Sequence, residues 1–186
     1  MDSNQLRTGH KVMVNGEPHE VVDYTLRQQP RLAAKMITKM RNLLTGNTVE
    51  KTFTSGEDVP TADIEVRKAS FLYSSGDEYS FMDDLNFEQF EFGNSILGGK
   101  AKFLKDGMEV FIMFWEGRPI SIQLAPTVVL EVSETEPGVR GDTATGGTKT
   151  ATLETGISVR VPLFVNIGDR IVVNTETGEY KERAKD

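Results

Sequence analysis

The sequence contains no cysteine in its 186 residues. Disulfide bonds and thiolate metal sites are therefore excluded, and such a composition suits a reducing compartment. Histidine is almost as scarce, because His10 and His19 are the only imidazoles and neither is surrounded by residues at metal-ligand spacing. We therefore expect both to be ordinary surface or core residues, and we predict no metal and no cofactor.

Long apolar runs are missing as well. No stretch approaches the ~20 apolar residues that a helix needs to cross a bilayer. The N-terminus also lacks the basic and then apolar layout of a signal peptide. These features predict a soluble, cytoplasmic protein without a membrane partner.

Basic residues are fewer than acidic residues in the whole chain, but they are concentrated in one stretch. The net charge of -7 argues against indiscriminate binding of polyanions. Between Val22 and Phe53, however, basic residues are set against only two acids, Asp23 and Glu50. The basic residues are Arg27, Arg31, Lys35, Lys39, Arg41 and Lys51. Taken alone, this stretch is typical of a solvated hairpin face, and an RNA-binding surface is the alternative.

Helical periodicity is nearly absent, whereas short alternating runs separated by Gly, Asn and Asp recur, which predicts an all-β chain. Residues 11–14 and 19–22 flank Asn15-Gly16, a pair suited to a type I′ hairpin turn. Residues 35–41 and 48–53 predict a second hairpin. Between the two hairpins, residues 26–33 contain Pro30, which interrupts ladder hydrogen bonds and favours an exposed tip.

Polar breaks near residues 64 and 127 predict three domains, over residues 1–64, 65–127 and 128–186. In the second, we expect strands at 65–73, 78–82, 108–115 and 120–124, with short helical turns at 87–90 and 94–97. Its aromatic side chains could stack on unpaired bases, but a structural core is the favoured interpretation in so acidic a segment. These side chains are Phe71, Tyr73, Tyr79 and Phe81.

The third segment combines predicted strands at 128–132, 170–174 and 179–181 with a glycine-rich loop. The loop residues are Gly141, Asp142, Thr143, Ala144, Thr145, Gly146 and Gly147. Their glycines superficially suggest a phosphate cradle, but Walker spacing and a following helix are both missing. We therefore expect an exposed loop.

The stretch from Lys149 to Gly168 is the most informative part of the chain. Ile157, Val159 and Val161 alternate with polar residues, as in a strand with one buried face, and Pro162 ends the ladder. Its spacing, Lys-x-Ala-x4-Gly-x2-Val-x-Val-Pro-x2-Val-x2-Gly, resembles the signature of bacterial elongation factor P at every fixed position. Further blocks resemble that family in the same order. They are residues 15–18, 43–46, 49–53, 81–83 and 137–144.

This resemblance covers essentially the whole chain, and it implies both a fold and a function. The implied fold is an SH3-like (KOW-like) barrel followed by two OB-fold barrels, in an L that imitates the outline of a transfer RNA. Members of the family bind both ribosomal subunits next to peptidyl-tRNA and help peptide bonds form at consecutive prolines. They are not enzymes. By the same resemblance, residues 141–147 would lie near the anticodon arm or the small subunit.

The family's first domain usually ends in Pro-Gly-Lys-Gly or Pro-Gly-Arg-Gly, whose central basic residue reaches toward the peptidyl-transferase centre. An ungapped alignment puts Arg31 at that central position, with Pro30 and Leu32 in place of the flanking glycines. The chain could thus belong to a divergent branch of the family. The tip loop comprises Gln28, Gln29, Pro30, Leu32 and Ala33, and the RNA-contacting residues would be Arg27, Lys35 and Lys39.

Arginine at the tip cannot receive the lysine-specific modification of some relatives, whereas others carry a sugar on a tip arginine. The resemblance thus allows an unmodified Arg31 or one that a modifying enzyme acts on. Its planar guanidinium suits contact with phosphate or RNA in either case.

Two other classes of function compete with a translation factor. A free-standing OB-fold protein that binds single-stranded RNA should carry a basic, aromatic platform, yet residues 65–127 and 128–186 have net charges of -4 and -3. For an enzyme, no triad or paired-carboxylate constellation can be assembled by spacing. Asp83-Asp84 and the pair Glu176 and Glu179 are expected to be ordinary surface acids.

Overall fold

The computed structural model describes residues 1–138 and 147–185. It consists mainly of β-strands, which confirms the predicted all-β class. The strands are β1 (Lys11–Val14), β2 (Glu17–Gln29), β3 (Leu32–Asn42), β4 (Thr48–Thr54), β5 (Ile64–Ser75), β6 (Glu78–Asp83), β7 (Gln89–Gly93), β8 (Glu109–Trp115), β9 (Arg118–Gln123), β10 (Thr127–Thr135), β11 (Thr148–Leu153), β12 (Ser158–Pro162), β13 (Arg170–Asn174) and β14 (Tyr180–Arg183). The helical segments are the 3₁₀ helices η1 (Ser3–Gln5) and η2 (Gly98–Phe103) and the single-turn α1 (Asn94–Leu97).

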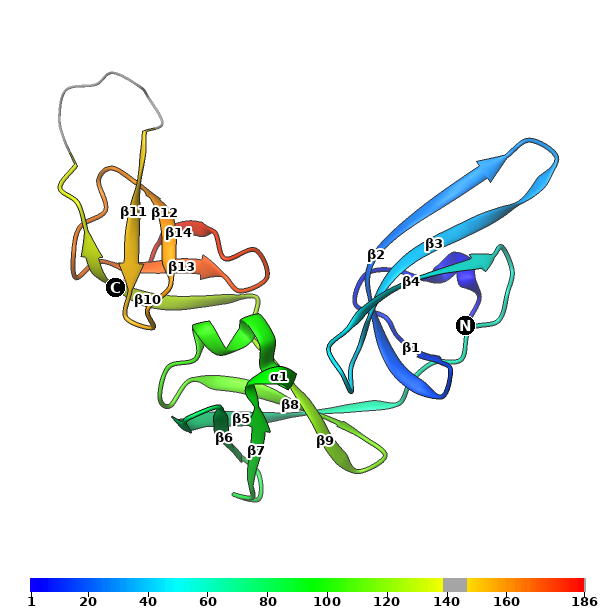
Figure 1. Ribbon diagram of the computed structural model, residues 1–186, viewed down its shortest axis with the longest axis horizontal. Coiled ribbons are helices and arrows are strands. Elements are labelled where there is room, and N and C mark those ends of the chain that lie inside the picture. Colours follow the sequence, from blue (N-terminus) through cyan, green and yellow to red (C-terminus); the bar gives the residue numbers. More distant parts are fainter. Residues whose placement is uncertain (139–146, 186) are drawn as a thin grey trace.

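The strands form three separate antiparallel sheets, which follow one another along the chain. Their strand orders are β1-β2-β3-β4, β7-β6-β5-β8-β9 and β12-β11-β10-β13-β14. In Figure 1 the first and third sheets form the two arms of an open L, and the second sheet lies where the arms meet. The division into domains at residues 64 and 127 stays a prediction, supported by the start of β5 at Ile64 and of β10 at Thr127.

The β1–β2 turn follows from the identity of its two residues. Asn15 and Gly16 have φ values of 53° and 78°, and two successive positive values define the type I′ turn that the Asn-Gly pair predicts. The return strand is much longer than residues 19–22, because β2 continues to Gln29 and pairs with β3 as far as Leu32. Its outer half is exposed on both faces, so it lacks the apolar alternation that identifies a half-buried strand.

The prediction of a helical turn at residues 87–90 is wrong. Gln89 and Phe90 belong to β7, where they pair with Met82 and Phe81 of β6. Phe90 and Phe92 then lie on one face of β7 and pack against the core, a period of two that indicates a strand. The helical turn at residues 94–97 is confirmed as α1.

Two hydrophobic cores hold the fold together, and they do not coincide with the three sheets. One core, around Met36 and Phe53, belongs to the first sheet. The other is continuous across the second and third sheets and includes buried residues from Ala69 to Val173. Phe71, Phe81 and the half-buried Tyr79 pack in this core as predicted, whereas the fourth aromatic residue, Tyr73, is exposed.

Polar contacts reinforce the union of the second and third sheets. The Thr175 hydroxyl donates a hydrogen bond to the Ala125 carbonyl at 2.6 Å. The Lys105 ammonium lies 3.0 Å from a carboxylate oxygen of Glu154, and the same oxygen accepts the Glu131 backbone N–H at 2.9 Å. The second and third sheets therefore form one packed unit, to which the first sheet is joined as another.

We expect acid to weaken the third sheet through Asp169. The Asn166 N–H and the Arg183 guanidinium each donate to this carboxylate at 2.8 Å, and the pKa of Asp169 is lowered, chiefly by the Asn166 hydrogen bond. A lowered carboxyl pKa adds stability above the unfolded-state pKa of about 4 and loses it as pH falls through the folded pKa. Urea midpoints measured at about pH 6 and about pH 3 should fall less for Asp169→Asn than for the parent. Equal falls would contradict this role.

Candidate nucleic-acid interface at the β2–β3 hairpin

The sequence-predicted tip residue lies at the apex of the longest hairpin in the structure. Gln29 of β2 pairs with Leu32 of β3, so that Pro30 and Arg31 alone form the turn between them. Proline at the first position and a positive φ at the second are the pattern of a type II turn. All of these residues are exposed to solvent.

Arg31 is held in a strained backbone conformation. Its φ of 65° lies in the left-handed region, which costs an L-residue other than glycine about 1–2 kcal/mol. Pro30 offsets part of this cost, because it fixes φ at the preceding position of the turn. Glycine would satisfy the turn more easily, so the side chain of Arg31 is present at some cost to the hairpin.

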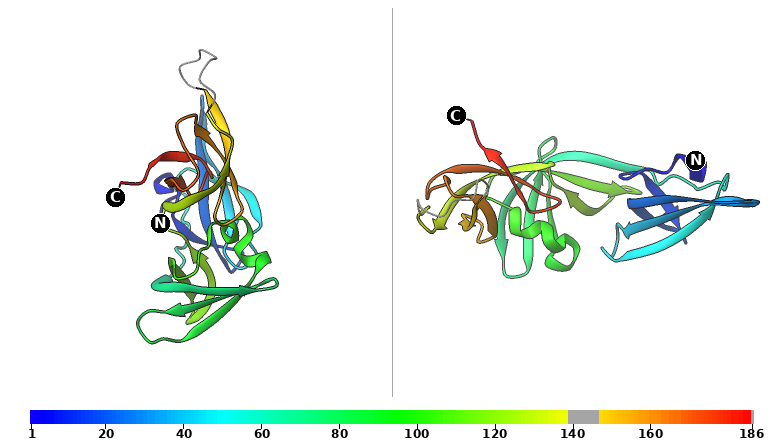
Figure 2. Two further views of the ribbon diagram at one scale, coloured as in Figure 1. Left: turned by 90° about the vertical axis from the view of Figure 1, so that its left-hand side faces the viewer. Right: turned by 90° about the horizontal axis from the view of Figure 1, so that it is seen from above.

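The predicted tip-loop residues lie mostly in strands. Gln28 and Gln29 end β2, and Leu32 and Ala33 begin β3. In Figures 1 and 2 the hairpin extends beyond the rest of the first sheet, away from the second. From Val22 to Gln29 the strand spans roughly 25 Å at about 3.3 Å per residue.

The three basic residues predicted to contact RNA share one face of this hairpin but differ in their surroundings. Arg27 lies directly opposite Lys35, and two like charges in such a pair destabilise a sheet. Lys39, four residues further along β3 than Lys35, lies between Asp23 of β2 and Glu50 of β4. The charge of Lys39 is therefore offset locally, whereas those of Arg27 and Lys35 are not.

No acidic residue occurs between Tyr24 and Thr38, so that Arg27, Arg31 and Lys35 form an uncompensated cationic tip. The fold does not require these charges, because their side chains are exposed and lie outside the core of the first sheet. Sequence reasoning identified all of these residues, but it missed the distinction between them. That distinction depends on the strand register, which shifts at two bulges, between Val21 and Asp23 and between Arg27 and Gln29.

The second predicted contact region, residues 141–147, lies outside the described residues except for Gly147. The residues just before and after it are closely fixed. The Lys149 ammonium donates a hydrogen bond to the Glu136 carbonyl at 2.6 Å, and Lys149 is buried. A Cβ on Gly138 would lie 2.5 Å from the Leu163 carbonyl oxygen, so only glycine fits at this position.

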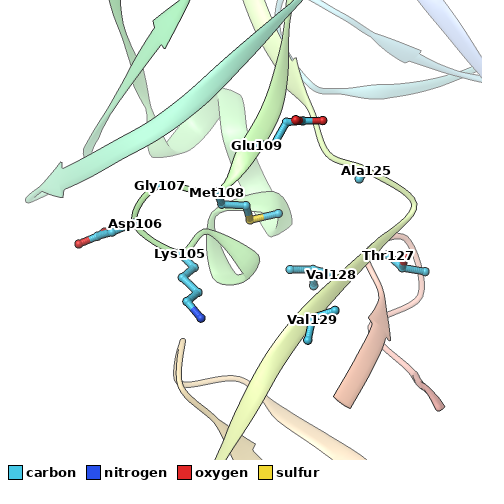
Figure 3. Close-up of a pocket in the computed structure, with 9 residues that line it drawn as sticks. All are labelled: Lys105, Asp106, Gly107, Met108, Glu109, Ala125, Thr127, Val128 and Val129. Atoms are coloured by element: carbon cyan, nitrogen blue, oxygen red, sulfur yellow. The ribbon is translucent and has the colours of Figure 1, made fainter. Parts of the chain in front are cut away.

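A pocket of about 360 Å³ lies between the turn that precedes β8 and the beginning of β10 (Figure 3). Its charged residues are already engaged or directed elsewhere. Lys105 pairs with Glu154, Glu109 pairs with Lys68 at 3.0 Å, and Figure 3 shows Asp106 directed away from the apolar side chains. The lining thus lacks a nucleophile with an adjacent base.

A larger groove of about 640 Å³ lies where the first sheet meets α1 and η2. Lys100 lines it and donates a hydrogen bond from its ammonium to the Ile122 carbonyl at 2.7 Å. Burial lowers the pKa of Lys100, and the nearby Arg41 lowers it further while Glu20 opposes this effect. The groove is a polar junction between the two packed units.

Within residues 1–138 and 147–185, no three His, Cys, Asp or Glu side chains gather as a metal site would require. None of the helices in this part of the chain is long and apolar enough to span a membrane.

Comparisons with known proteins agree with the architecture. The family model of the elongation factor P KOW-like domain matches residues 2–59, that of the elongation factor P OB domain matches residues 64–122, and that of the elongation factor P C-terminal region matches residues 128–183. Elongation factor P of Synechococcus sp. (strain JA-3-3Ab) is 48% identical over 180 residues, which cover 97% of each chain. That of Dictyoglomus turgidum is 47% identical over 181 residues, covering 97% of this chain and 98% of the relative.

A solved structure, eukaryotic translation initiation factor 5A from Methanococcus jannaschii, is similar in fold. Its TM-score is 0.52 at 22% identity, over 67% of this chain and 90% of that one. The matches of three consecutive family models and the near-half identity over almost the full length lead to one conclusion: the chain belongs to the elongation factor P family and is a translation elongation factor, not an enzyme.

Proposed function

We propose that the protein binds the ribosome next to peptidyl-tRNA and stimulates peptide-bond formation, relieving stalls at consecutive prolines. The observation that carries this proposal is the uncompensated cationic tip, Arg27, Arg31 and Lys35, on a molecule of net charge -7. Phosphate groups attract such a tip, and the acidic remainder of the molecule disfavours non-specific binding to RNA. Membership of the elongation factor P family supports the same assignment.

The tip would act by ordering the reactants rather than by chemistry of its own. A guanidinium at Arg31 donates up to five hydrogen bonds in a fixed plane and carries a positive charge. Contacts that hold peptidyl-tRNA near attack geometry reduce the entropic part of the barrier, and such ordering can contribute several kcal/mol. The ribosome would supply the groups that react.

The proposal extends to the rest of the molecule. Residues 141–147 would contact the small subunit or the anticodon arm, and the whole factor would work in the cytoplasm. A modifying enzyme that acts on Arg31 is a further proposed partner. The intact mass of protein purified from its native host tests this partner, because a sugar-sized increment on Arg31 would establish a modification.

Added salt should weaken ribosome binding. Each RNA phosphate neutralised by the tip releases bound counterions, and about three such contacts predict a loss in affinity of about twentyfold to fortyfold between roughly 50 and 200 mM monovalent salt at constant magnesium. A binding titration with fluorescently labelled protein and purified ribosomes measures this dependence. Affinity that does not change with salt would contradict the electrostatic account.

The matched variants are Arg27→Gln, Lys35→Gln and Lys39→Gln. We expect each of the first two to flatten the salt dependence, because their charges are uncompensated in the hairpin. Lys39→Gln should change it less, since Asp23 and Glu50 flank Lys39. Tight binding of the parent to free single-stranded RNA, without ribosomes, would instead favour a free-standing RNA-binding protein.

A further inference from the structure

The groove between the first sheet and the other packed unit has the size of a small-molecule site. Its volume of about 640 Å³ lies within the range of about 300–1,000 Å³ that is common for ligand pockets. Both units contribute to its lining, because Glu20 and Arg41 come from the first sheet and Lys100 comes from η2. At its edge the turn between β3 and β4 points toward α1 (Figure 1), and a Cβ on Gly46 would lie 3.8 Å from the Ser95 carbonyl oxygen. The groove is therefore enclosed from two sides.

Fixed turns form the walls of the groove. On the first sheet, the buried Asn42 side chain accepts the N–H groups of Leu44 and Thr45 at 2.8 and 3.1 Å. On the third sheet, the Asn174 side chain accepts the Glu176 N–H at 2.8 Å. The space thus exists before a ligand enters it, and a preformed site loses little conformational entropy on binding.

The lining holds more positive than negative charge. Its three basic side chains are Arg41 of β3 and Lys100 and Lys102 of η2. Its two acids are Glu20 and Glu176. Within residues 1–138 and 147–185, none of the three basic side chains forms an ion pair. A negatively charged ligand would therefore be attracted into the groove.

The excess of positive charge is centred on Arg41 and Lys100. Glu20 lies opposite Arg41 in the β2–β3 ladder and opposite Lys11 in the β1–β2 ladder, so that one carboxylate faces two cations. The Lys100 ammonium donates to the Ile122 carbonyl, a neutral acceptor that leaves its charge uncompensated. The pKa of Lys100 is lowered, chiefly by burial and next by the charge of Arg41, whose effect exceeds the opposing one of Glu20. An anion between Arg41 and Lys100 would relieve this repulsion.

The other side chains of the lining indicate what the anion is attached to. A guanidinium and an ammonium together suit a phosphate group, which arginine binds through two parallel hydrogen bonds and lysine as a point charge. Around them, side-chain amides and hydroxyls can hydrogen-bond a sugar or a base. These belong to Asn47, Thr48, Ser95, Ser121 and Gln123. Ile96 and Leu124 add apolar area for the face of a base.

We propose that the groove binds a nucleoside phosphate, whose phosphate group lies between Arg41 and Lys100 and so bridges the two packed units. The inference concerns the free protein and does not depend on ribosome binding. Because the two phosphate contacts come from different units, the ligand favours the arrangement in which the first sheet lies close to η2. It assigns the junction a role in setting the orientation of the hairpin that carries Arg31.

A titration of the isotopically labelled, full-length protein followed by NMR tests the site. With ADP and with GDP, amide shifts should change on both walls, in residues 41–48 and 95–102, with a dissociation constant below about 1 mM. Adenosine lacks the phosphate and should bind at least about tenfold more weakly. Shifts confined to the tip of the β2–β3 hairpin, or none at about 1 mM nucleotide, would overturn the proposal. So would a short single-stranded RNA that shifts both walls at lower concentrations than either nucleotide.

The variants Arg41→Gln and Lys100→Gln each remove one charge, from opposite walls of the groove. Each should weaken the binding of ADP and GDP at least about tenfold. Arg27→Gln is the matched control, because it removes a charge from the hairpin tip, outside the groove, and should bind as the parent does. Arg41 is exposed, so its replacement stays decisive even if Lys100→Gln does not fold. Equal binding by Arg41→Gln, Arg27→Gln and the parent would refute the site.

Discussion

Replacing Arg31 by alanine is expected to lower the rate of synthesis through consecutive prolines about tenfold or more, while leaving the fold intact. Each tenfold loss corresponds to about 1.4 kcal/mol of barrier, which a positioned guanidinium can supply through two or three charge-assisted hydrogen bonds. Stability should change by no more than about 0.5 kcal/mol, because Arg31 is exposed and lies outside both cores.

The measurement is a reconstituted translation assay on a message with consecutive proline codons, and Arg118→Ala is the matched control. Arg118 is exposed at the β8–β9 turn, on a different sheet. The variant Arg31→Gly adds a second test, because glycine relieves the positive φ and should stabilise the hairpin while losing the same activity. If Arg31→Ala, Arg118→Ala and the parent rescue synthesis equally, Arg31 is not the functional tip.

The largest change in stability is expected from Phe81→Ala, which should lower the free energy of unfolding by about 3–5 kcal/mol. Phe81 is fully buried between Phe71 and Phe92, whose ring centroids lie 5.4 and 5.8 Å from its own. Truncation would remove both aromatic contacts and leave a cavity that rigid strands on either side cannot close.

Urea denaturation followed by circular dichroism measures this loss, with the half-exposed Tyr73→Ala as a control that should cost less than about 1 kcal/mol. Amide hydrogen exchange then shows which sheets lose stability. Protection should fall in the third sheet as well as the second, since the two share one core, while the first sheet keeps its own. A loss in Phe81→Ala as small as that of the control would contradict this account of the core.

Much of the fold could be predicted because local residues specify it. Asn15 and Gly16 tolerate positive φ, so the identities of these two residues were enough to locate the turn. The alternating Val159 and Val161 are both buried in β12, as expected. The helical turn predicted at residues 87–90 failed where local preference is overridden. Phe87 has a left-handed φ in a turn whose Leu85 and Phe87 N–H groups both donate hydrogen bonds to Asp83, and these bonds depend on the folded sheet.

The candidate interface could be predicted only in part. The ungapped alignment and the charge pattern located Arg31, Arg27 and Lys35, but the exposed strands around them carry no periodic signal. Register decides which charges are compensated, and β-bulges set that register. The union of the second and third sheets in one core was equally inaccessible, because it arises from contacts between residues that are distant in the chain.

The separate core of the first sheet has a consequence for how the protein is made. All four strands of that sheet lie within residues 11–54, so this unit holds every partner it needs once the first third of the chain has left the ribosome. The second sheet must wait for β10 to β13 before its core is complete. During vectorial synthesis the hairpin bearing Arg31 should therefore mature first, while the remainder is still being translated.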